Sequence, residues 1–457
     1  MSDRRDILIT NATYFSNQDR CFYKKNIRVK GDIIVDISED IGKVPNVEVI
    51  NGDGCVIYPG LVNTHHHLFQ SILKAVPQSM SLTLSGWLDA VPLRYGKFIT
   101  QDILRVAVRI GFSDLLRGGV TATVDHHYLY FGNLGDQHTD IIFEEADRLG
   151  IKLCLARGFS LKNMEGAEES SNELNKESLD QLVGRLENVV NKYHQTRDNN
   201  TRCVAIAPGT PFHSCSLGEL DEIGKVAQRL KIRRHSHLSE TREDYVDFCM
   251  SKYHKKPVEL LSDTGWLGPD VWFAHAVHLD DEEINRLAES GTAISHCPTS
   301  NARLGTGIAP ITKFMRAGIK VGIGVDGAAS AESNHMLSEV NLAMLLQKAK
   351  CGPDSLNWQD CIVMATKNGA EIAGFSNTGE IAVGKSADLV IYDVQGFESA
   401  GYHLKCLAPI LSNGRCKIKY SFVNGRMTVK DDVVVGIDPT ELCREADDAV
   451  YQLKMKL

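Results

Sequence analysis

The feature that most constrains the fold of this chain is an alternation of short apolar runs with segments of helical periodicity between residues 60 and 380. The apolar runs include "TATVDHH", "KLCLARG", "CVAIAPG" and "VGIGVDG", and the helical segments include "TDIIFEEADRLG" and "DEEINRLAESG". Strands that alternate with helices indicate parallel βαβ units, and about eight such units favour an α/β fold of the (β/α)8 TIM-like barrel type. A doubly wound open sheet is the alternative.

Both ends of the chain are instead rich in short strand patterns broken by Gly, Asn and Asp. Examples are "DILITNATYF" near the start and "IKYSFVNGRMTVKDD" near the end. Neither end has enough strands for a stable sheet of its own, so we expect the two ends to pair into one small β-sandwich. The predicted organisation is a first sandwich part at 1–59, the barrel at 60–378, and a second sandwich part with a final amphipathic helix at 379–457. The polar stretch 164–180 is expected to be a surface loop or lid.

The composition excludes several classes of partner. The formal charge of −8 and the pI near 6.1 give no general attraction to nucleic acids or anionic membranes. The chain lacks an apolar stretch of the ~18 residues typical of a membrane span, and its first residues lack a signal-peptide core. The twelve cysteines form no C-x-x-C pair, which favours reduced thiols. We therefore expect a cytoplasmic protein that acts on a small molecule.

Polar residues follow the predicted strands at the ends where barrel enzymes build their active sites. A single histidine in such a place is usually structural, but histidine or aspartate at six strand ends predicts a shared site. These residues are His65, His67, Asp125, His126, His127, His235, His237, His275, His296 and Asp326.

The histidine run at residues 65–67 has the spacing of a metal-binding pair. Side chains two apart on an extended strand share a face, so His65 and His67 can reach one cation while His66 faces away. The motif "HSHLSE" supplies a third imidazole from either His235 or His237.

Carboxylates complete the predicted chemistry. Asp326 follows an apolar run, and three imidazoles with one carboxylate suit a divalent ion such as Zn²⁺. Such an ion lowers the pKa of bound water to about 7. Glu240 lies three residues beyond His237, and a carboxyl group in a partly dry pocket can transfer protons during hydrolysis of a C–N bond.

The motifs "PGLVNTHHHLFQS", "HSHLSET", "WFAHAVHL", "SHCPTSNARLGTGIAP" and "GVDGAAS" resemble, in this order, the cytosine/guanine-deaminase-like branch of the amidohydrolase superfamily. The resemblance covers essentially the whole chain. It implies one divalent metal ion, Zn²⁺ first with Fe²⁺ or Mn²⁺ as alternatives. The implied ligands are His65, His67, His237 and Asp326. It also implies that Glu240 protonates the ring nitrogen and the leaving ammonia, that His275 orients the attacking water, and that Asp326 takes the water proton. No lysine precedes His235 at the position where binuclear relatives carry a carbamylated lysine, so one metal ion is expected. The resemblance also implies a homodimer.

Within this branch the motifs "CVIYPGLVNTHHHLFQS", "WLDAVPLRYGKF" and "DHHYLYF" are most similar to deaminases of isoxanthopterin and 8-oxoguanine. The resemblance implies that Gln70 reads the substrate amide and that Trp87 forms a pocket wall. Pro211 stands where guanine deaminases carry an arginine, which leaves recognition to other groups, with His127 and Arg157 as candidates.

The expected reaction is metal-dependent hydrolytic deamination of a 2-amino-4-oxo fused heterocycle. Isoxanthopterin, which gives a 7-oxo-lumazine and ammonia, is the first choice of substrate. The alternatives are 8-oxoguanine, which gives urate, then guanine, and then an s-triazine hydrolase activity. A non-catalytic scaffold is disfavoured because every implied ligand is retained together with Glu240 and His275.

Overall fold

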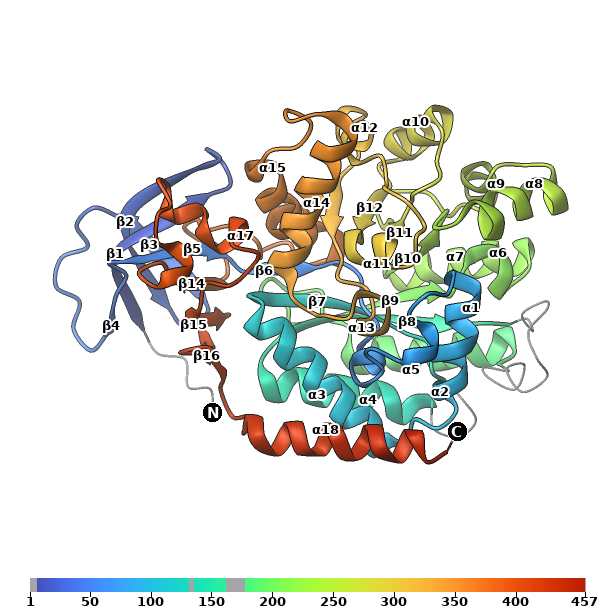
Figure 1. Ribbon diagram of the computed structural model, residues 1–457, viewed down its shortest axis with the longest axis horizontal. Coiled ribbons are helices and arrows are strands. Elements are labelled where there is room, and N and C mark those ends of the chain that lie inside the picture. The colour runs from blue at the N-terminus through green and yellow to red at the C-terminus, as the bar shows by residue number, and fades with distance from the viewer. Residues whose placement is uncertain (1–5, 131–134, 162–176, 457) are drawn as a thin grey trace.

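Eight parallel strands close into a barrel in the computed structural model of the chain, which describes residues 6–130, 135–161 and 177–456. Helices surround the barrel on the outside (Figure 1). The (β/α)8 barrel predicted from the alternation of strands and helices is therefore confirmed. In barrel order the strands are β10 (Arg233–Leu238), β11 (Val271–His275), β12 (Ala293–His296), β13 (Val321–Ile323), β6 (Leu61–Asn63), β7 (Val120–His127), β8 (Lys152–Phe159) and β9 (Arg202–Pro208).

Local capping signals fix where several outer helices begin. The side chains of Ser216 and Asp280 accept the N–H of the residue three positions later, and the glutamate at that position accepts a backbone N–H in return. The longer helices are α3 (Gln101–Arg117), α4 (Gly135–Leu149), α5 (Leu179–Tyr193), α7 (Leu217–Leu230), α9 (Pro257–Asp263), α10 (Asp281–Ser290), α14 (Met336–Cys351) and α18 (Pro439–Lys454). The shorter ones are α1 (Leu84–Leu88), α2 (Arg94–Gly96), α6 (Pro211–Ser214), α8 (Phe248–Tyr253), α11 (Pro298–Arg303), α12 (Ile311–Arg316), α13 (Ala328–Ala331), α15 (Trp358–Val363), α16 (Gly369–Ala373) and α17 (Ala408–Leu411).

The barrel interior is filled by small side chains beneath a layer of histidines. Alternate residues of a strand share a face, and the inward face of β7, β8 and β9 carries Ala122, Val124, Ala156, Ala205 and Ala207. The indole of Trp272 occupies the remaining space in this cluster, and the ring of His235 stacks on it at 4.5 Å between centroids. Because the interior below is closed, any ligand must approach the histidines from the ends of the strands.

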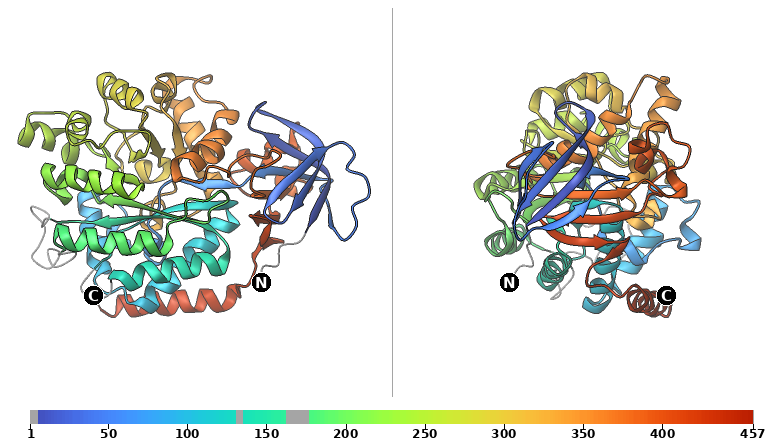
Figure 2. Two further views of the ribbon diagram at one scale, coloured as in Figure 1. Left: turned by 180° about the vertical axis from the view of Figure 1, so that it is seen from behind. Right: turned by 90° about the vertical axis from the view of Figure 1, so that its left-hand side faces the viewer.

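The two chain ends pair into one nine-stranded sheet with its own apolar core. β14 runs antiparallel to β5 and joins the C-terminal strands to the N-terminal ones, as predicted, and the sheet stands beside the barrel (Figure 2). The final helix α18 leaves this sheet and lies along α3 (Figure 1). The strands are β1 (Ile7–Ser16), β2 (Cys21–Lys30), β3 (Ile33–Ser38), β4 (Glu48–Asn51), β5 (Cys55–Pro59), β14 (Leu389–Asp393), β15 (Ile418–Val423), β16 (Arg426–Lys430) and β17 (Val433–Val434).

A buried ion pair fastens the sheet to the barrel. The ammonium of Lys152, at the start of β8, donates to the carboxylate of Asp388 at 2.6 Å and to the hydroxyl of Thr378 at 2.7 Å. Both charged side chains are fully buried. The position of the terminal sheet is therefore tied to a barrel strand by a specific polar contact.

Two other sequence predictions concern the loop at residues 164–180 and membrane-spanning segments. In the predicted loop 164–180, residues 164–176 lie outside the described residues, and residues 179–180 already belong to α5. Among the residues that the structure describes, no helix combines the length and the apolar character needed to cross a membrane.

Candidate metal-dependent active site

The histidine run lies just beyond a barrel strand rather than on it. β6 ends at Asn63, so the extended strand assumed for His65 and His67 stops two residues too early. The backbone nevertheless stays tied to the neighbouring strand end, because the N–H of Asp326 donates to the carbonyl of His65 at 3.0 Å. The rings of His65 and His67 lie 4.8 Å apart, and His66 is turned away, with its Nδ1 accepting the N–H of His67.

Left-handed backbone conformations aim several of the predicted side chains. The φ angles are +45° at Ser239, +71° at His275, +50° at Ala276 and +63° at Asp326, and none of these residues is glycine. Such conformations are uncommon for residues with a Cβ and gather at functional sites. They turn the chain sharply at the ends of β10, β11 and β13, where Glu240, His275 and Asp326 are held.

Backbone carbonyls fix the protonation of two imidazoles. The Nδ1 of His67 lies 2.7 Å from the carbonyl of His126, and the Nδ1 of His237 lies 2.5 Å from the carbonyl of Gly209. A carbonyl oxygen only accepts, so each Nδ1 carries the hydrogen and each Nε2 presents a lone pair. These two Nε2 atoms lie 3.3 Å apart, and two lone pairs at that distance call for a cation between them.

The third imidazole is oriented through a second histidine. The Nδ1 of His235 donates to the carbonyl of Trp272 at 3.0 Å, so its Nε2 accepts from the Nδ1 of His65 at 2.8 Å. The Nε2 of His65 is therefore the lone-pair atom, and it is buried with no hydrogen-bond partner in the described part of the chain. The sequence left open whether His235 or His237 joins the group, and the structure places His237 in it and His235 behind His65.

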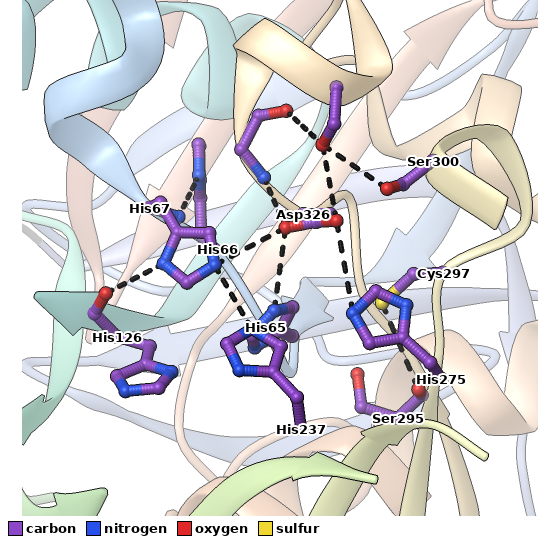
Figure 3. Close-up of polar contacts among 12 residues, drawn as sticks. His65, His66, His67, His126, His237, His275, Ser295, Cys297, Ser300 and Asp326 are labelled. Atoms are coloured by element: carbon purple, nitrogen blue, oxygen red, sulfur yellow. Dashed lines mark hydrogen bonds and ion pairs between the residues drawn. The ribbon is translucent and has the colours of Figure 1, made fainter. Parts of the chain in front are cut away.

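The carboxylate of Asp326 closes the group (Figure 3). Its Oδ1 lies 3.4 Å from the Nε2 atoms of both His65 and His67, and it accepts the N–H of Gly327. Burial raises the pKa of this carboxyl group, whereas donation and positive charge from His65, His275 and His67 lower the pKa well below its ordinary value. With these imidazoles neutral, the N–H of Gly327 remains as a donor that stabilises the carboxylate. Burial also lowers the pKa of His67 to about 4. The group therefore consists of neutral imidazoles around the ionised carboxylate of Asp326.

An acceptor-only group of this kind fits a divalent metal ion. The buried, unpartnered Nε2 of His65 and the facing Nε2 atoms of His67 and His237 offer nitrogen ligands, and Asp326 offers oxygen. The metal-ligating atoms fall into two overlapping sets whose members lie within 4.8 Å of one another. These sets are His65, His67, His126 and His237, and His65, His275 and Asp326.

Glu240 and His275 lie beside this group and face each other. The Oε2 of Glu240 is 3.5 Å from the Nε2 of His275. Burial, reinforced by the negative charge of Asp326, raises the pKa of Glu240 to about 8, so its carboxyl group is largely protonated at neutral pH. The Nδ1 of His275 donates to the Oδ1 of Asn301 at 2.8 Å, which leaves its Nε2 as an acceptor.

Gln70 lies next to the group, against Gly327 and Tyr128. Its Nε2 donates to the hydroxyl of Tyr128 at 3.1 Å, and its Oε1 is buried without a partner among the described residues. Gly327 makes room for it, because a Cβ there would lie 1.9 Å from the Oε1 of Gln70. The ring of Tyr128 lies edge-on to His67 at 5.1 Å. The indole N–H of Trp87 donates to the carbonyl of Ala329 at 3.1 Å and so supports α13.

His127 and Arg157 have their described contacts elsewhere. The Nε2 of His127 lies 3.4 Å from the Nδ1 of His138 on the outer helix α4. The guanidinium of Arg157 makes two hydrogen bonds of 2.7 and 2.6 Å to the carboxylate of Glu177, and it stacks over the ring of Tyr130 at 4.1 Å. The structure therefore brings Gln70 near the metal-ligating group but directs these two side chains to other partners.

Sequence reasoning did not predict the roles of three residues that the geometry singles out. The inward-facing His126 belongs to one of the two ligand sets, although "TATVDHH" marked it only as a polar strand end. Asn301 orients His275, and its only signal was its place in the quoted motif "SHCPTSNARLGTGIAP". The role of His235 depends on a backbone carbonyl and had no signal in the residue types.

Comparisons with known proteins identify the family of the chain. Residues 56–428 match the Amidohydrolase family. An isoxanthopterin deaminase from an unknown prokaryotic organism is 38% identical over 443 residues, covering 94% of this chain and 92% of that protein. An 8-oxoguanine deaminase from Pseudomonas aeruginosa is 34% identical over 384 residues, covering 84% of each. The crystal structure of an atrazine chlorohydrolase from Arthrobacter aurescens TC1, complexed with zinc, superposes with a TM-score of 0.90 at 27% identity, covering 97% of this chain and 100% of that one.

Proposed function

Because the chain belongs to the amidohydrolase family, we propose that it is a hydrolytic deaminase of a 2-amino-4-oxo fused heterocycle, and that its substrate is isoxanthopterin. The relative named for isoxanthopterin supports this choice, since it aligns along nearly the whole chain. The products would be a 7-oxo-lumazine and ammonia.

The observation that carries the proposal is the convergence of three imidazole Nε2 atoms and an ionised carboxylate with no donor among them. We assign His65, His67, His237 and Asp326 as the ligands of one divalent ion. Zn²⁺ is the first choice, supported by the zinc in the related chlorohydrolase, and Fe²⁺ and Mn²⁺ suit the same ligands. When bound, such an ion lowers the pKa of water to about 7 and so makes hydroxide available at neutral pH.

The chain's own residues move the protons. The ionised Asp326 accepts a proton from the attacking water, and the Nε2 of His275 accepts a hydrogen bond from the same water and so orients it. The water oxygen forms a bond to the carbon that carries the amino group. Glu240, protonated at neutral pH because its pKa is about 8, gives its proton to the adjacent ring nitrogen.

The second half of the reaction reverses these transfers. The bond from carbon to the amino nitrogen breaks, and its electron pair leaves with that nitrogen. Glu240 takes the proton of the new hydroxyl group and gives it to this nitrogen, which departs as ammonia, and the proton held by Asp326 then returns to Glu240. The oxygen from water remains as the new carbonyl group. One water is consumed and one ammonia released, and Glu240 and Asp326 return to their starting protonation states.

Gln70 is the residue we propose for recognition of the heterocycle. Its unpartnered Oε1 can accept an N–H of the 2-amino-4-oxo edge, while Tyr128 holds the other end of the carboxamide. Replacing Gln70 by leucine removes one buried hydrogen bond, and this should lower kcat/KM by about 10- to 100-fold, the equivalent of ~1–3 kcal/mol. Trp87 is proposed to shape the pocket wall through its contact with α13.

A substrate panel tests the proposal. Ammonia release should be measured with isoxanthopterin, pterin, 8-oxoguanine, guanine and cytosine at equal protein and metal concentrations. Isoxanthopterin and pterin differ by one ring oxo group, as do 8-oxoguanine and guanine, so each pair isolates the recognition of that group. We expect the highest kcat/KM with isoxanthopterin, at least about 10-fold above pterin. A preference for cytosine, or no ammonia from any member, would overturn the proposal.

8-Oxoguanine is the second candidate substrate. It presents the same 2-amino-4-oxo edge, and the relative from Pseudomonas aeruginosa that is named for it is 34% identical to this chain over 384 residues. If it gives the higher kcat/KM, the reaction class and the assigned residues stay the same and the product becomes urate.

A further inference from the structure

We propose that His126 is an additional metal ligand, which gives the bound ion a second position made of four imidazoles and biases the site towards Zn²⁺ over Mn²⁺. The inference rests on the proposed function, because it concerns the same metal centre. It assigns a role in metal binding to His126, which has no role in the proposed function.

The orientation of the His126 ring is fixed by a carbonyl. Its Nε2 lies 3.2 Å from the carbonyl of Ala207 on the neighbouring strand β9, so Nε2 carries the hydrogen and Nδ1 carries the lone pair. That Nδ1 is buried and has no hydrogen-bond partner among the described residues. A buried acceptor without a partner is rare in proteins and asks for an explanation, and a bound cation supplies one.

The ring of His126 also lies close to the other metal-ligating imidazoles. His126 follows Val124 by two positions on β7 and therefore shares the inward face of the barrel. Its ring centroid is 5.0 Å from that of His237 and 5.3 Å from that of His67, and Figure 3 shows it beside these rings. The metal-ligating nitrogen atoms of His65, His67, His126 and His237 lie within 4.8 Å of one another.

The two positions differ in chemistry but share three ligands. One combines His65, His67 and His237 with the carboxylate of Asp326, and the other replaces the carboxylate with His126. One ion at a time can use the shared imidazoles. Imidazole nitrogen suits Zn²⁺, whereas carboxylate oxygen suits Mn²⁺. A fourth imidazole should therefore stabilise bound Zn²⁺ more than bound Mn²⁺.

A matched pair of variants tests this. In His126→Gln the amide can still donate to Ala207, but the imidazole ligand is lost. His127→Gln is the same change one residue later, on the opposite face of β7 and away from the ligand set. The dissociation constants of Zn²⁺ and Mn²⁺ would be measured on metal-free protein by competition with a chelator. We expect His126→Gln to weaken Zn²⁺ binding by about 10-fold or more and Mn²⁺ binding by less than about 3-fold, and His127→Gln to change neither.

A measurement on the unmodified protein keeps the inference testable if the variant does not fold. X-ray absorption at the zinc edge should report scattering from an average of more than three imidazole rings per zinc, whereas three rings would overturn the inference. An unchanged Zn²⁺ to Mn²⁺ affinity ratio in a folded His126→Gln protein would overturn it as well, as would an equal loss of both metals. In each of these cases a wild-type protein that binds zinc and releases ammonia leaves the proposed function standing. Wild-type protein that binds no metal would refute both.

Discussion

Replacing His235 by phenylalanine tests whether His235 sets the tautomer of His65. The phenyl ring retains the stack on Trp272, which places the two rings 4.5 Å apart with an angle of 19° between their planes. It removes the Nε2 that accepts the Nδ1–H of His65 at 2.8 Å. His65 would then be free to carry its hydrogen on Nε2, the atom that faces the other ligands, and in that tautomer it cannot bind a metal at that atom.

The expected cost follows from these contacts. A buried N–H left without an acceptor costs about 1–3 kcal/mol, and loss of the partner that orients a metal-ligating histidine typically weakens metal binding by about 10- to 100-fold. The second effect equals about 1.4–2.8 kcal/mol. We therefore expect His235→Phe to weaken Zn²⁺ binding by this factor and to retain the fold of the metal-free protein.

Chelator competition gives the zinc dissociation constant, and urea unfolding of the metal-free protein gives the change in stability. His235→Gln is the control, since its amide oxygen can still accept from His65, and it should bind zinc within about 3-fold of the unmodified protein. If the phenylalanine and glutamine variants bind zinc equally tightly, the tautomer of His65 is not set by His235 and the reasoning fails.

Three further predictions concern catalysis, pH and stability. Glu240→Gln should keep its metal but lose about 10²- to 10⁴-fold in kcat, and loss of the metal together with kcat would contradict the assigned role. The unmodified enzyme, unlike the variant, should lose activity as pH rises above about 8, because the carboxyl group of Glu240 has a pKa of about 8 and loses its proton there. Burial lowers the pKa of His67 to about 4 in the metal-free site, so protons should compete with zinc at this ligand only near pH 4. Titrations at pH 5 and 6, below the ionisation of bound water near pH 7, should give zinc affinities within about 2-fold after correction for the chelator; a gain of about 10-fold, as expected from an imidazole with the ordinary pKa of about 6.5, would refute this. Lys152→Met should lower the free energy of unfolding, measured in urea, by about 3–5 kcal/mol, because it leaves the charge of Asp388 buried and unpaired. The double variant Lys152→Met, Asp388→Asn should recover much of this lost stability. No recovery would argue against an uncompensated charge as the cause.

Much of the architecture could be predicted because it depends on patterns that persist along the chain. The barrel follows from repeated strand and helix periodicities, and the pairing of the two ends follows from their shortage of strands. The gathering of His65, His237 and Asp326 follows from topology alone, since the ends of parallel strands meet at one rim of a closed barrel.

The orientation of each imidazole could not be predicted in the same way. It is set by the carbonyl groups of His126, Gly209 and Trp272, and every residue type carries the same carbonyl. Only the register between strands decides which carbonyl faces which ring. For the same reason the sequence could not choose between His235 and His237, which share a strand face and differ in depth within the barrel.

Residues with left-handed backbone conformations at the ends of the barrel strands show why the local sequence alone does not predict the geometry of the site. Left-handed conformations of residues such as Ser239 and Ala276 cost about 1–3 kcal/mol each and persist only where the surroundings over-determine them. Here the neighbouring strand ends supply that constraint: the N–H of Ala276 donates to the carbonyl of Leu238, and the N–H of Val277 donates to the carbonyl of Ser239. Each turn is thus held by the neighbouring strand end, so these contacts require β10 and β11 to be paired. The geometry that brings Glu240 within 3.5 Å of the His275 ring is therefore a property of this strand pair, and neither segment alone would reproduce it.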